Sequence, residues 1–436
     1  MILTAAKIQN FKGIEDLELE FHPGFNLIKG VNGTGKTSIL EALAVGLGGF
    51  VAGASSVNTR NFSLNEIRRE YTRIGDGSCD EQQFLPVSVF LQATLGSEAI
   101  DWTRTRTSAK ASRSATNPRV IARRAETMAN DPEAMLPVLC YHGTGRVWAQ
   151  KRAKSQNAFK SKYSRTVGYT DALQDASNNK FLLDWCDKME RVSWQKRAVI
   201  AEYDAARQAV VDFLNRMEQV PSCEFFLDAQ LGELMIRQSE KLLPVSCLSA
   251  GYQSLVWLVF DVASRMAMLN PSLRNQITKT PGIVLIDELD MHLHPKWQWH
   301  VIDALRETFP QVQFIATTHA PILFSSAKNV WLIDIDRLYD YETSIDGFGV
   351  RKVAEYATSH YGLDVNSALT QYQGGYDLPE AVKERAATIQ RVLDAGQYNE
   401  AKRLIDALGE ETAPESPLLV ELKTRYEIET GLLGIE

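Results

Sequence analysis

Apolar and polar residues alternate with a period of two near the start of the chain and predict two strands. The alternation covers residues 2–8 and 17–21, and a turn through Lys12 and Gly13 connects the two segments. Residues 25–28 then form a short apolar run that predicts a buried strand. The apolar spacing becomes helical after Ser38. The chain is therefore expected to begin an α/β domain with an antiparallel pair.

The same patterns continue through the middle of the chain. Residues 199–217 carry apolar side chains every three or four positions and predict a helix of roughly twenty to thirty residues. The other predicted elements are strands at residues 87–91, 138–141, 283–286, 312–317 and 330–335 and helices at residues 253–268 and 297–308. Alternating strands and helices indicate a mostly parallel sheet.

Helical patterns dominate the end of the chain, from about residue 366 to residue 436. They cover residues 381–393 and 400–408, with breaks at Gly396 and at residues 409–417. This region is expected to be a small helical cap, which either packs on the rest of the chain or contacts a partner.

Composition is that of a soluble globular protein: 436 residues of which 44% are hydrophobic. No segment approaches the roughly twenty uninterrupted apolar residues of a membrane span, and Lys7 and Lys12 interrupt any signal-peptide core. A cytoplasmic protein without a membrane partner is expected. The cysteines form no C-x-x-C pair and are expected to be buried small hydrophobes: Cys79, Cys140, Cys186, Cys223 and Cys247.

Charge is unevenly distributed along the chain, although its net value is −7. Basic residues gather between Trp102 and Arg165: Arg104, Arg106, Lys110, Arg113, Arg119, Arg123, Arg124, Arg146, Lys151, Arg152, Lys154, Lys160, Lys162 and Arg165. Such a segment can neutralise the phosphates of a nucleic acid, or it can form an ordinary solvated surface. Both interpretations stay open.

Residues 30–37 fit the phosphate-binding pattern G-x-x-x-x-G-K-[ST] and lie between a predicted strand and a predicted helix. In this pattern Lys36 reaches the β- and γ-phosphates, Thr37 holds Mg²⁺, and backbone N–H groups surround the triphosphate. The sequence therefore predicts ATP and Mg²⁺ as cofactors. The predicted ATP-binding residues of this loop are Gly30, Asn32, Gly33, Thr34, Gly35, Lys36, Thr37 and Ser38.

The apolar strand at residues 283–286 delivers two acids, Asp287 and Glu288, to its C-terminal end. Phosphoryl transfer depends mainly on positioning and charge stabilisation. Asp287 is therefore expected to hold Mg²⁺ together with Thr37, and Glu288 to orient or deprotonate the attacking water.

Two further segments give the chain a resemblance to ABC-type ATPases. Residues 248–253 match the signature Leu-Ser-x-Gly-x-Gln with Ser249, Gly251 and Gln253, and residues 317–321 are similar to the switch segment around His319. The resemblance implies that the signature binds the γ-phosphate of ATP held by the opposite subunit, and that His319 touches the γ-phosphate. A homodimer or higher oligomer is implied.

Finer features are similar to the branch with RecF, the chromosome-maintenance heads and the overcoming-lysogenization-defect nucleases. They are residues 10–14, Asn32 and residues 290–295. The branch implies that Lys12 lies near the phosphates, and that His292 and His294 belong to a dimer-contact loop, although a metal-binding pair is the alternative.

One further Mg²⁺ ligand is open. Family members carry a glutamine near the position of residues 141–146, but this segment has none. Gln92, placed after the strand at residues 87–91, is another candidate, and His142 is best interpreted as an ordinary buried histidine.

Most of the chain, the helical tail included, resembles the stand-alone ATPases of antiphage defence, above all the Septu type. Those act beside a separately encoded HNH nuclease, sometimes with a retron. The implied fold is an α/β ABC-type P-loop ATPase head with a mixed sheet, a basic α/β insertion and a C-terminal helical cap. The expected divisions are an ATPase lobe with the phosphate loop at residues 1–50, an insertion at 51–240, a second ATPase lobe at 241–350 and the tail at 351–436.

Three functions follow from these features: a nucleotide-gated defence ATPase that controls a nuclease, a RecF-like ATPase that binds DNA directly, and the motor subunit of a transporter. The first explains an ATP site without an evident effector site. The large basic insertion and the dimer-contact loop match the DNA-associated branch better than a transporter motor.

Overall fold

The computed structural model divides the chain into two units, residues 1–363 and residues 364–436. It describes residues 1–54, 57–73, 79–146, 164–175, 178–218, 223–238, 241–335, 352–353, 355–358, 361–362, 380–411 and 416–433. The division into four segments made from the sequence stays a prediction.

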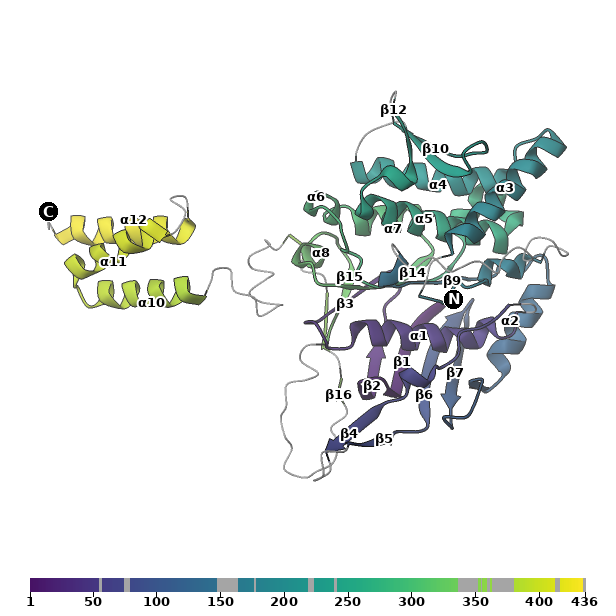
Figure 1. Cartoon of the computed structure of the whole chain (residues 1–436), viewed down its shortest axis with the longest axis horizontal. Coiled ribbons are helices and arrows are strands. Elements are labelled where there is room, and N and C mark those ends of the chain that lie inside the picture. Colours follow the sequence, from purple (N-terminus) through teal and green to yellow (C-terminus); the bar gives the residue numbers. More distant parts are fainter. Residues whose placement is uncertain are drawn as a thin grey trace. The chain divides into compact units, whose positions relative to one another are not determined.

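A six-stranded sheet lies at the centre of the first unit (Figure 1). Its strands, in spatial order, are β17 (Glu355–Thr358), β15 (Val330–Asp334), β3 (Phe25–Lys29), β14 (Val312–Thr318), β13 (Gly282–Ile286) and β9 (Val138–His142). All neighbours are parallel except β17, which is antiparallel to β15. Every residue of β3, β13 and β14 is buried, as expected for strands covered on both faces. The mostly parallel sheet and its five predicted strands are confirmed.

A second six-stranded sheet is almost entirely antiparallel. Its order is β16 (Lys352–Val353), β2 (Ile14–Glu20), β1 (Ile2–Phe11), β6 (Val87–Leu95), β7 (Glu98–Arg106) and β8 (Ala115–Asn117). The predicted antiparallel opening is confirmed, because β1 and β2 pair on either side of the turn at Lys12 and Gly13. Only the short β16 runs parallel to its neighbour.

Helix α1 (Lys36–Val51) lies between these two sheets (Figure 1). Its sequence is apolar on all sides, which suits a helix covered all round. The indole N–H of Trp102, on β7, donates a 2.8 Å hydrogen bond to the Gly46 carbonyl oxygen and fixes the helix against the antiparallel sheet. The phosphate-loop helix is therefore anchored in the core.

The remaining helices of the first unit are α2 (Val120–Asn130), α3 (Asn179–Lys196), α4 (Ala201–Glu218), α5 (Ala250–Leu269), α6 (Pro295–Gln298), α7 (Val301–Thr308) and α8 (Pro321–Ser325). Helices α4, α5 and α7 lie on the face of the parallel sheet away from α1 (Figure 1). The predicted helices at residues 199–217 and 253–268 are confirmed as α4 and α5, and α4 has 18 residues.

The single helix predicted at residues 297–308 is wrong. Helix α6 starts two residues earlier, with Pro295 in its first turn and the His294 ring Nδ1 accepting a hydrogen bond from the Lys296 N–H. Trp299 and His300 then separate α6 from α7, and His300 is the N-cap residue of α7. The apolar spacing runs across the break, which explains why it was not recognised from the sequence.

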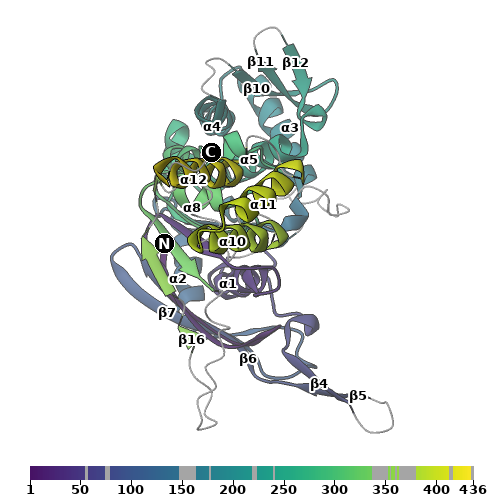
Figure 2. The same ribbon diagram turned by 90° about the vertical axis from the view of Figure 1, so that its left-hand side faces the viewer.

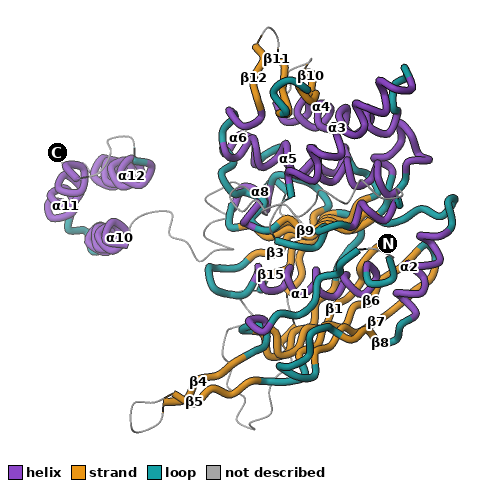
Figure 3. Tube along the Cα trace, turned by 45° about the vertical axis from the view of Figure 1, so that its right-hand side comes forward, coloured by secondary structure: helices purple, strands orange, loops and turns teal. Residues whose placement is uncertain are grey.

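Two smaller sheets complete the first unit. One is the hairpin of β4 (Arg69–Arg73) and β5 (Cys79–Gln83), which extends away from the antiparallel sheet (Figure 2). The other joins β10 (Cys223–Asp228), β11 (Glu233–Gln238) and β12 (Lys241–Pro244), next to α4 (Figure 3). Among the described residues, no helix has the length and apolarity to cross a bilayer.

The described residues of the second unit form three helices, α10 (Glu380–Asp394), α11 (Tyr398–Glu411) and α12 (Pro417–Leu433). They enclose a core of their own: Ala386, Ile389, Leu393, Ala401, Ile405, Leu408, Leu419 and Leu422. The predicted helical tail is confirmed, with α12 in addition to the two helices read from the sequence. Its internal core means that the tail folds around its own apolar residues.

Candidate functional site

The phosphate loop connects the end of β3 to the start of α1. Gly33 and Gly35 have φ angles of +87° and +93°, a backbone conformation that residues other than glycine rarely adopt. Gly35 is the N-cap residue of α1, and the Thr34 hydroxyl donates to the Val31 carbonyl oxygen at 2.9 Å. The N–H groups at the helix start therefore face an open turn, the usual arrangement for binding a phosphate.

Lys36 is the first residue of α1, and its ammonium group lies across this loop. Its Nζ donates to the carbonyl oxygens of Gly30, at 2.5 Å, and Val31, at 2.9 Å. The residue is only 6% exposed. The positive charge is therefore held over the turn in which a phosphate would sit.

Asp287 connects the phosphate loop to the neighbouring strands. Its Oδ2 accepts a 2.8 Å hydrogen bond from the Thr37 hydroxyl, and its Oδ1 accepts a 2.6 Å hydrogen bond from the Thr317 hydroxyl. Asp287 follows β13 and is fully buried, whereas Thr317 lies near the end of the adjacent β14. A carboxylate and a hydroxyl in contact are hard oxygen donors of the type that Mg²⁺ prefers, so this pair fits the predicted cation.

Glu288 follows directly and has an unusual backbone. Its φ angle is +47°, in the left-handed region, and its N–H donates to the Thr317 hydroxyl at 2.8 Å. Such conformations cost energy and gather at functional sites. Thr317 therefore fixes both acids, a role that the sequence analysis did not assign to it. Its position beside the acids on the next parallel strand is the signal that could have found it.

Asp290 holds the segment that carries His319. Its Oδ1 accepts hydrogen bonds from the Thr318 hydroxyl at 2.5 Å and from the His319 N–H at 3.3 Å. Since β3, β14 and β13 are parallel neighbours, their C-terminal ends bring the phosphate loop, the two acids and His319 to one edge of the sheet.

The signature segment lies at the start of α5. Ser249 is the N-cap residue and is exposed, and its side chain makes no capping hydrogen bond. Gln253 does not point away from the chain, because its Nε2 donates to the carbonyl oxygens of Ser246 and Leu248 at 2.9 and 2.7 Å. Gln253 thus shapes the loop that presents Ser249.

Gly251 allows a close approach within the chain. A Cβ at this position would lie 2.2 Å from the His292 carbonyl oxygen. The signature segment therefore packs directly on the turn that follows Glu288, where His292 itself has a φ angle of +61°. His292 and His294 are both exposed there. Neither belongs to the one converging group of potential metal ligands found among the described residues, which is Cys140, His142 and Asp261.

Lys12 forms an ion pair with Glu41 of α1. The same carboxylate lies 3.7 Å from Arg60, which also pairs with Glu66 at 3.0 Å. The structure thus places Lys12 against the phosphate-loop helix, with its own φ angle at +49°. Its predicted proximity to phosphates stays a prediction.

Gln92 does not follow a strand, contrary to the sequence analysis. It lies within β6 of the antiparallel sheet, between Ala5 of β1 and Asp101 of β7. The apolar run ends at Leu91, but apolar and polar residues continue to alternate as far as Leu95. The predicted strand therefore ended too early. Asp287 instead follows the C-terminal end of β13, in the mostly parallel sheet. His142 is buried, as expected.

Three arginines of the basic segment point into the protein. Arg104 and Arg106, on β7, are 1% and 7% exposed and donate to backbone carbonyl oxygens, including those of Arg60 and Phe62. Arg165 binds the carbonyl oxygens at the end of α2. The interpretation of Arg104 and Arg106 as phosphate contacts is wrong, because both side chains are buried and bound to backbone carbonyl oxygens. Arg165 is half-buried, and its guanidinium already donates to several carbonyl oxygens. Lys151, Arg152, Lys154, Lys160 and Lys162 lie outside the described residues.

The cysteines are also not all buried. Cys140 and Cys186 are buried, but Cys79 and Cys247 are exposed, which corrects the expectation from the sequence. Cys79 begins β5, the second strand of the exposed hairpin, and Cys247 lies just before the signature segment.

Models of known protein families match the segments that carry most of these site residues. A family model described as an AAA domain matches residues 6–210, and a second AAA-domain model, whose description adds the AbiEii toxin and a type IV TA system, matches residues 255–326. Together they cover the phosphate loop, both acids and His319. They leave the signature segment and the tail unmatched.

Curated proteins that are similar in sequence include a probable ATPase of a retron and a Septu protein. The retron Vc95 probable ATPase of Vibrio cholerae serotype O1 biovar El Tor is 35% identical over 143 residues, which are 33% of this chain and 27% of that protein. The Septu protein PtuA of Bacillus thuringiensis is 26% identical over 347 residues, 75% of this chain and 74% of that protein. The match thus spans about a quarter of the retron protein's length and about three quarters of PtuA.

Among solved structures, an SMC head bound to the C-terminal winged-helix domain of ScpA matches with a TM-score of 0.49 and 15% identity. The match covers 82% of this chain and 98% of that one.

Proposed function

Since the chain is an AAA-domain ATPase homologous to the Septu protein PtuA and to the retron Vc95 ATPase, we propose that it binds and hydrolyses ATP with Mg²⁺ between two copies of itself. We further propose that the nucleotide state of this dimer controls a separately encoded nuclease of the HNH type in antiphage defence. The protein acts in the cytoplasm in this proposal.

The observation that carries the proposal is the contact between Thr37 and Asp287. It joins the phosphate loop to the end of β13 at 2.8 Å, although 250 positions separate the two residues in the chain. Bound Mg²⁺ supplies positive charge that screens the phosphates during transfer. Thr37 and Asp287 are the residues that would hold it.

The other residues at this edge each have a separate role. Lys36 exchanges the carbonyl oxygens of its own loop for phosphate oxygens, and the N–H groups of the loop bind the rest of the triphosphate. Glu288 orients a water molecule and accepts its proton, and His319 donates a hydrogen bond to the γ-phosphate. Thr317 and Asp290 keep the two acids and the His319 backbone in position.

The exposed signature segment supports a shared site. Ser249 and the exposed His292 turn form one surface, because Gly251 packs on the His292 backbone. We propose that Ser249 of each copy binds the triphosphate held by Lys36 of the other. Gln253 contributes by holding the loop rather than by touching the nucleotide.

The described residues support the proposal that the nuclease is a separate protein. Their only converging group of potential metal ligands is Cys140, His142 and Asp261, of which Cys140 and His142 are buried and Asp261 is partly exposed. No second cluster of acids within these residues suits a metal-dependent nuclease. Nuclease activity in the purified chain alone would contradict this part of the proposal.

Two substitutions separate binding from hydrolysis. Lys36→Ala should abolish ATP binding, measured by calorimetry, because it removes the charge over the loop. Glu288→Gln should leave the ATP dissociation constant nearly unchanged but lower kcat by about a hundredfold or more. It should also accumulate an ATP-dependent dimer, visible by light scattering. Wild-type kcat in Glu288→Gln would remove Glu288 from this role.

The shared site is tested separately at Ser249. Ser249→Arg should prevent ATP-dependent dimerisation and leave the affinity of the monomer for ATP intact, since the serine acts on the other copy's nucleotide. Ser97→Arg is the matched control, because Ser97 is exposed in the turn after β6. Gly251 is unsuitable for this test because any side chain there meets the His292 backbone. An ATP-dependent dimer of Ser249→Arg would contradict the proposed geometry.

A further inference from the structure

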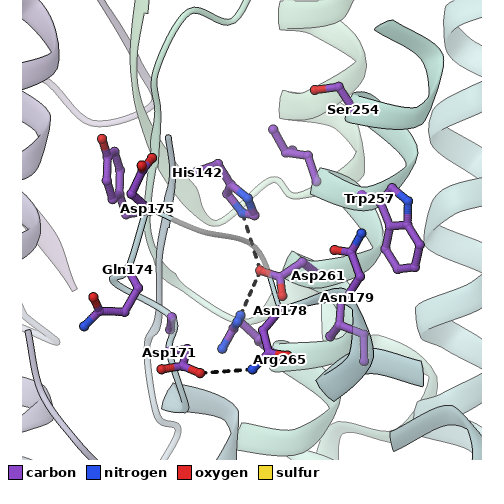
Figure 4. A pocket seen from close by; sticks show the side chains of 14 residues that line it. His142, Asp171, Gln174, Asp175, Asn178, Asn179, Ser254, Trp257, Asp261 and Arg265 are labelled. Atoms are coloured by element: carbon purple, nitrogen blue, oxygen red, sulfur yellow. Dashed lines mark hydrogen bonds and ion pairs between the residues drawn. The ribbon is translucent and has the colours of Figure 1, made fainter. Parts of the chain in front are cut away.

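A small cavity of about 20 Å³ lies between the end of β9, residues 171–175 and 178–179, and α5 (Figure 4). Its volume suits a single water molecule rather than a substrate. Charged and polar side chains line it, among them His142, Asp171, Asp261 and Arg265. The cavity therefore marks a polar contact between the signature helix and the parallel sheet.

On the helix side, Asp261 and Arg265 lie one turn apart on α5. The Arg265 Nε donates to Asp261 Oδ2 at 2.8 Å, and its Nη1 donates to the carbonyl oxygens of Gly168 and Thr170, both at 2.8 Å. The Arg265 side chain is 4% exposed. The carboxylate of Asp261 is thus held by a buried guanidinium that is itself bound to two backbone carbonyl oxygens.

On the sheet side, His142 faces the same carboxylate. Its Nε2 lies 3.5 Å from Asp261 Oδ2, and its side chain is 7% exposed. The His142 carbonyl oxygen accepts a 2.8 Å hydrogen bond from the Asp287 N–H. Two contacts therefore lead from the signature helix to the acid in the proposed Mg²⁺ site.

A metal ion is the alternative occupant of this place. Ligand atoms of Cys140, His142 and Asp261 all lie within 4.8 Å of one another. However, the Arg265 guanidinium already supplies the positive charge next to Asp261, and burial raises the pKa of the Cys140 thiol, which keeps it neutral. The arrangement therefore favours an ion-pair network over a metal site.

We propose that His142 and Asp261 are positioning residues that link the signature helix to Asp287. Helix α5 begins beside Ser249, and Asp261 lies twelve residues further on, about 18 Å along a helix that moves as one body. A shift of α5 on engaging the other copy's nucleotide changes the Asp261–His142 contact and, through the His142 carbonyl, the position of Asp287. This inference rests on the proposed function of the site.

The test uses two variants that keep the approximate size of the side chain. Asp261→Asn removes the charge of the carboxylate, and His142→Gln removes the imidazole ring. Hydrogen exchange of the Asp287 amide, measured on the full chain without nucleotide, should rise about tenfold in each variant because its acceptor is less well held. The matched control is Asp204→Asn, which breaks an Arg207 ion pair of 2.7 Å on α4 and should change neither exchange nor turnover.

Kinetics give the second readout. Each variant should lower kcat about tenfold with little change in KM, and the double variant should be no worse than either single one, as expected for residues acting as a unit. Should Asp261→Asn fail to fold, His142→Gln decides the outcome alone.

The possible failures are distinguishable. Unchanged exchange and unchanged kcat in His142→Gln would overturn the link while leaving the ATPase intact. Raised exchange of the Asp287 amide in the two variants, together with no ATP hydrolysis by the wild-type protein, would instead contradict the proposed function and leave the link standing. One equivalent of zinc in the purified protein, lost in Cys140→Ser but kept in Cys186→Ser, would replace the ion-pair network by a metal site and overturn the proposal.

Discussion

Thr317 connects both acids of the site through a single hydroxyl. It donates to Asp287 and accepts from the N–H of Glu288, the residue with the positive φ angle. The motif Asp-Glu after an apolar strand is visible in the sequence. The residue that orients it comes from another strand, 30 positions away, so only the fold brings the two together.

The first prediction concerns this hydroxyl. Thr317→Val keeps the shape of the side chain but leaves a carboxylate oxygen and an N–H without their partner, which should lower the free energy of unfolding by about 1–3 kcal/mol. It should also lower kcat, because Glu288 is no longer held. Urea unfolding and steady-state kinetics measure the two effects.

Thr308→Val is the control for this change. The Thr308 hydroxyl is also buried, but it donates to the Ala304 carbonyl oxygen of its own helix. That oxygen keeps its backbone hydrogen bond within the helix when the hydroxyl is removed. The control should be less destabilised and should retain wild-type kcat. Equal effects of both substitutions on kcat would show that Thr317 does not act on the site.

Cysteine accessibility gives a second prediction at this scale. Cys79 and Cys247 are exposed, whereas burial raises the pKa of the Cys140 thiol and raises that of Cys186 to about 12. Because the thiolate is the reactive form, iodoacetamide at pH 8 should modify the exposed pair at least about a hundredfold faster. Peptide mass spectrometry on the native protein measures the four rates. Fast labelling of Cys140 would contradict the packing of β9 against α5.

At the scale of elements, the strand-loop-helix unit around the phosphate loop could be predicted almost completely. Its signals are local: a short apolar run, glycines where φ is positive, and a helix that is apolar all round. The parallel order of β3, β14 and β13 followed from alternation of strands and helices. The antiparallel sheet beneath α1 was only begun in the sequence analysis, because pairing between distant strands leaves no local pattern.

Charge was the least reliable signal for an element. The run of basic residues pointed to a surface, yet β7 turns Arg104 and Arg106 toward the core, where they satisfy carbonyl oxygens of the segment at residues 60–62. Composition cannot distinguish an arginine that binds phosphate from one that holds a loop, since both use the same donors.

A third prediction tests this difference. Arg104→Ala removes one donor each from the Arg60 carbonyl oxygen and from Asn61 Oδ1, which keeps the Ser114 N–H, and it opens a cavity, so it should lower the free energy of unfolding by about 2–5 kcal/mol. The pKa of Arg104 is lowered by burial to about 10, so the folded protein keeps it charged at neutral pH. Thermal unfolding monitors the loss.

The exposed Arg123 of α2 provides the comparison. Arg123→Ala should change stability by no more than about 0.5 kcal/mol. If the protein binds duplex DNA at low salt, only the exposed arginine can contribute directly. A stable Arg104→Ala variant that has lost DNA binding would restore the interpretation of Arg104 as a phosphate contact.

For the whole molecule, the tail was predicted as helical but its relation to the ATPase could not be read from the sequence. The structure gives it a separate core in residues 364–436, with α12 closing the bundle. Periodicity identifies the buried face of each helix, but it does not say whether that face packs on the same unit or on another one. The internal core answers that question for these helices.

The separate core leads to the last prediction, that the two units unfold independently. Ile405→Asp places a charge at a site that is 3% exposed, which should unfold the C-terminal helices while leaving the first unit folded. Calorimetry should then lose one transition and keep the one that ATP and Mg²⁺ shift upward. Arg403→Asp, on the exposed face of the same helix, should keep both. A loss of ATP affinity in Ile405→Asp alone would mean that the tail supports the site, and that the two cores are not energetically independent.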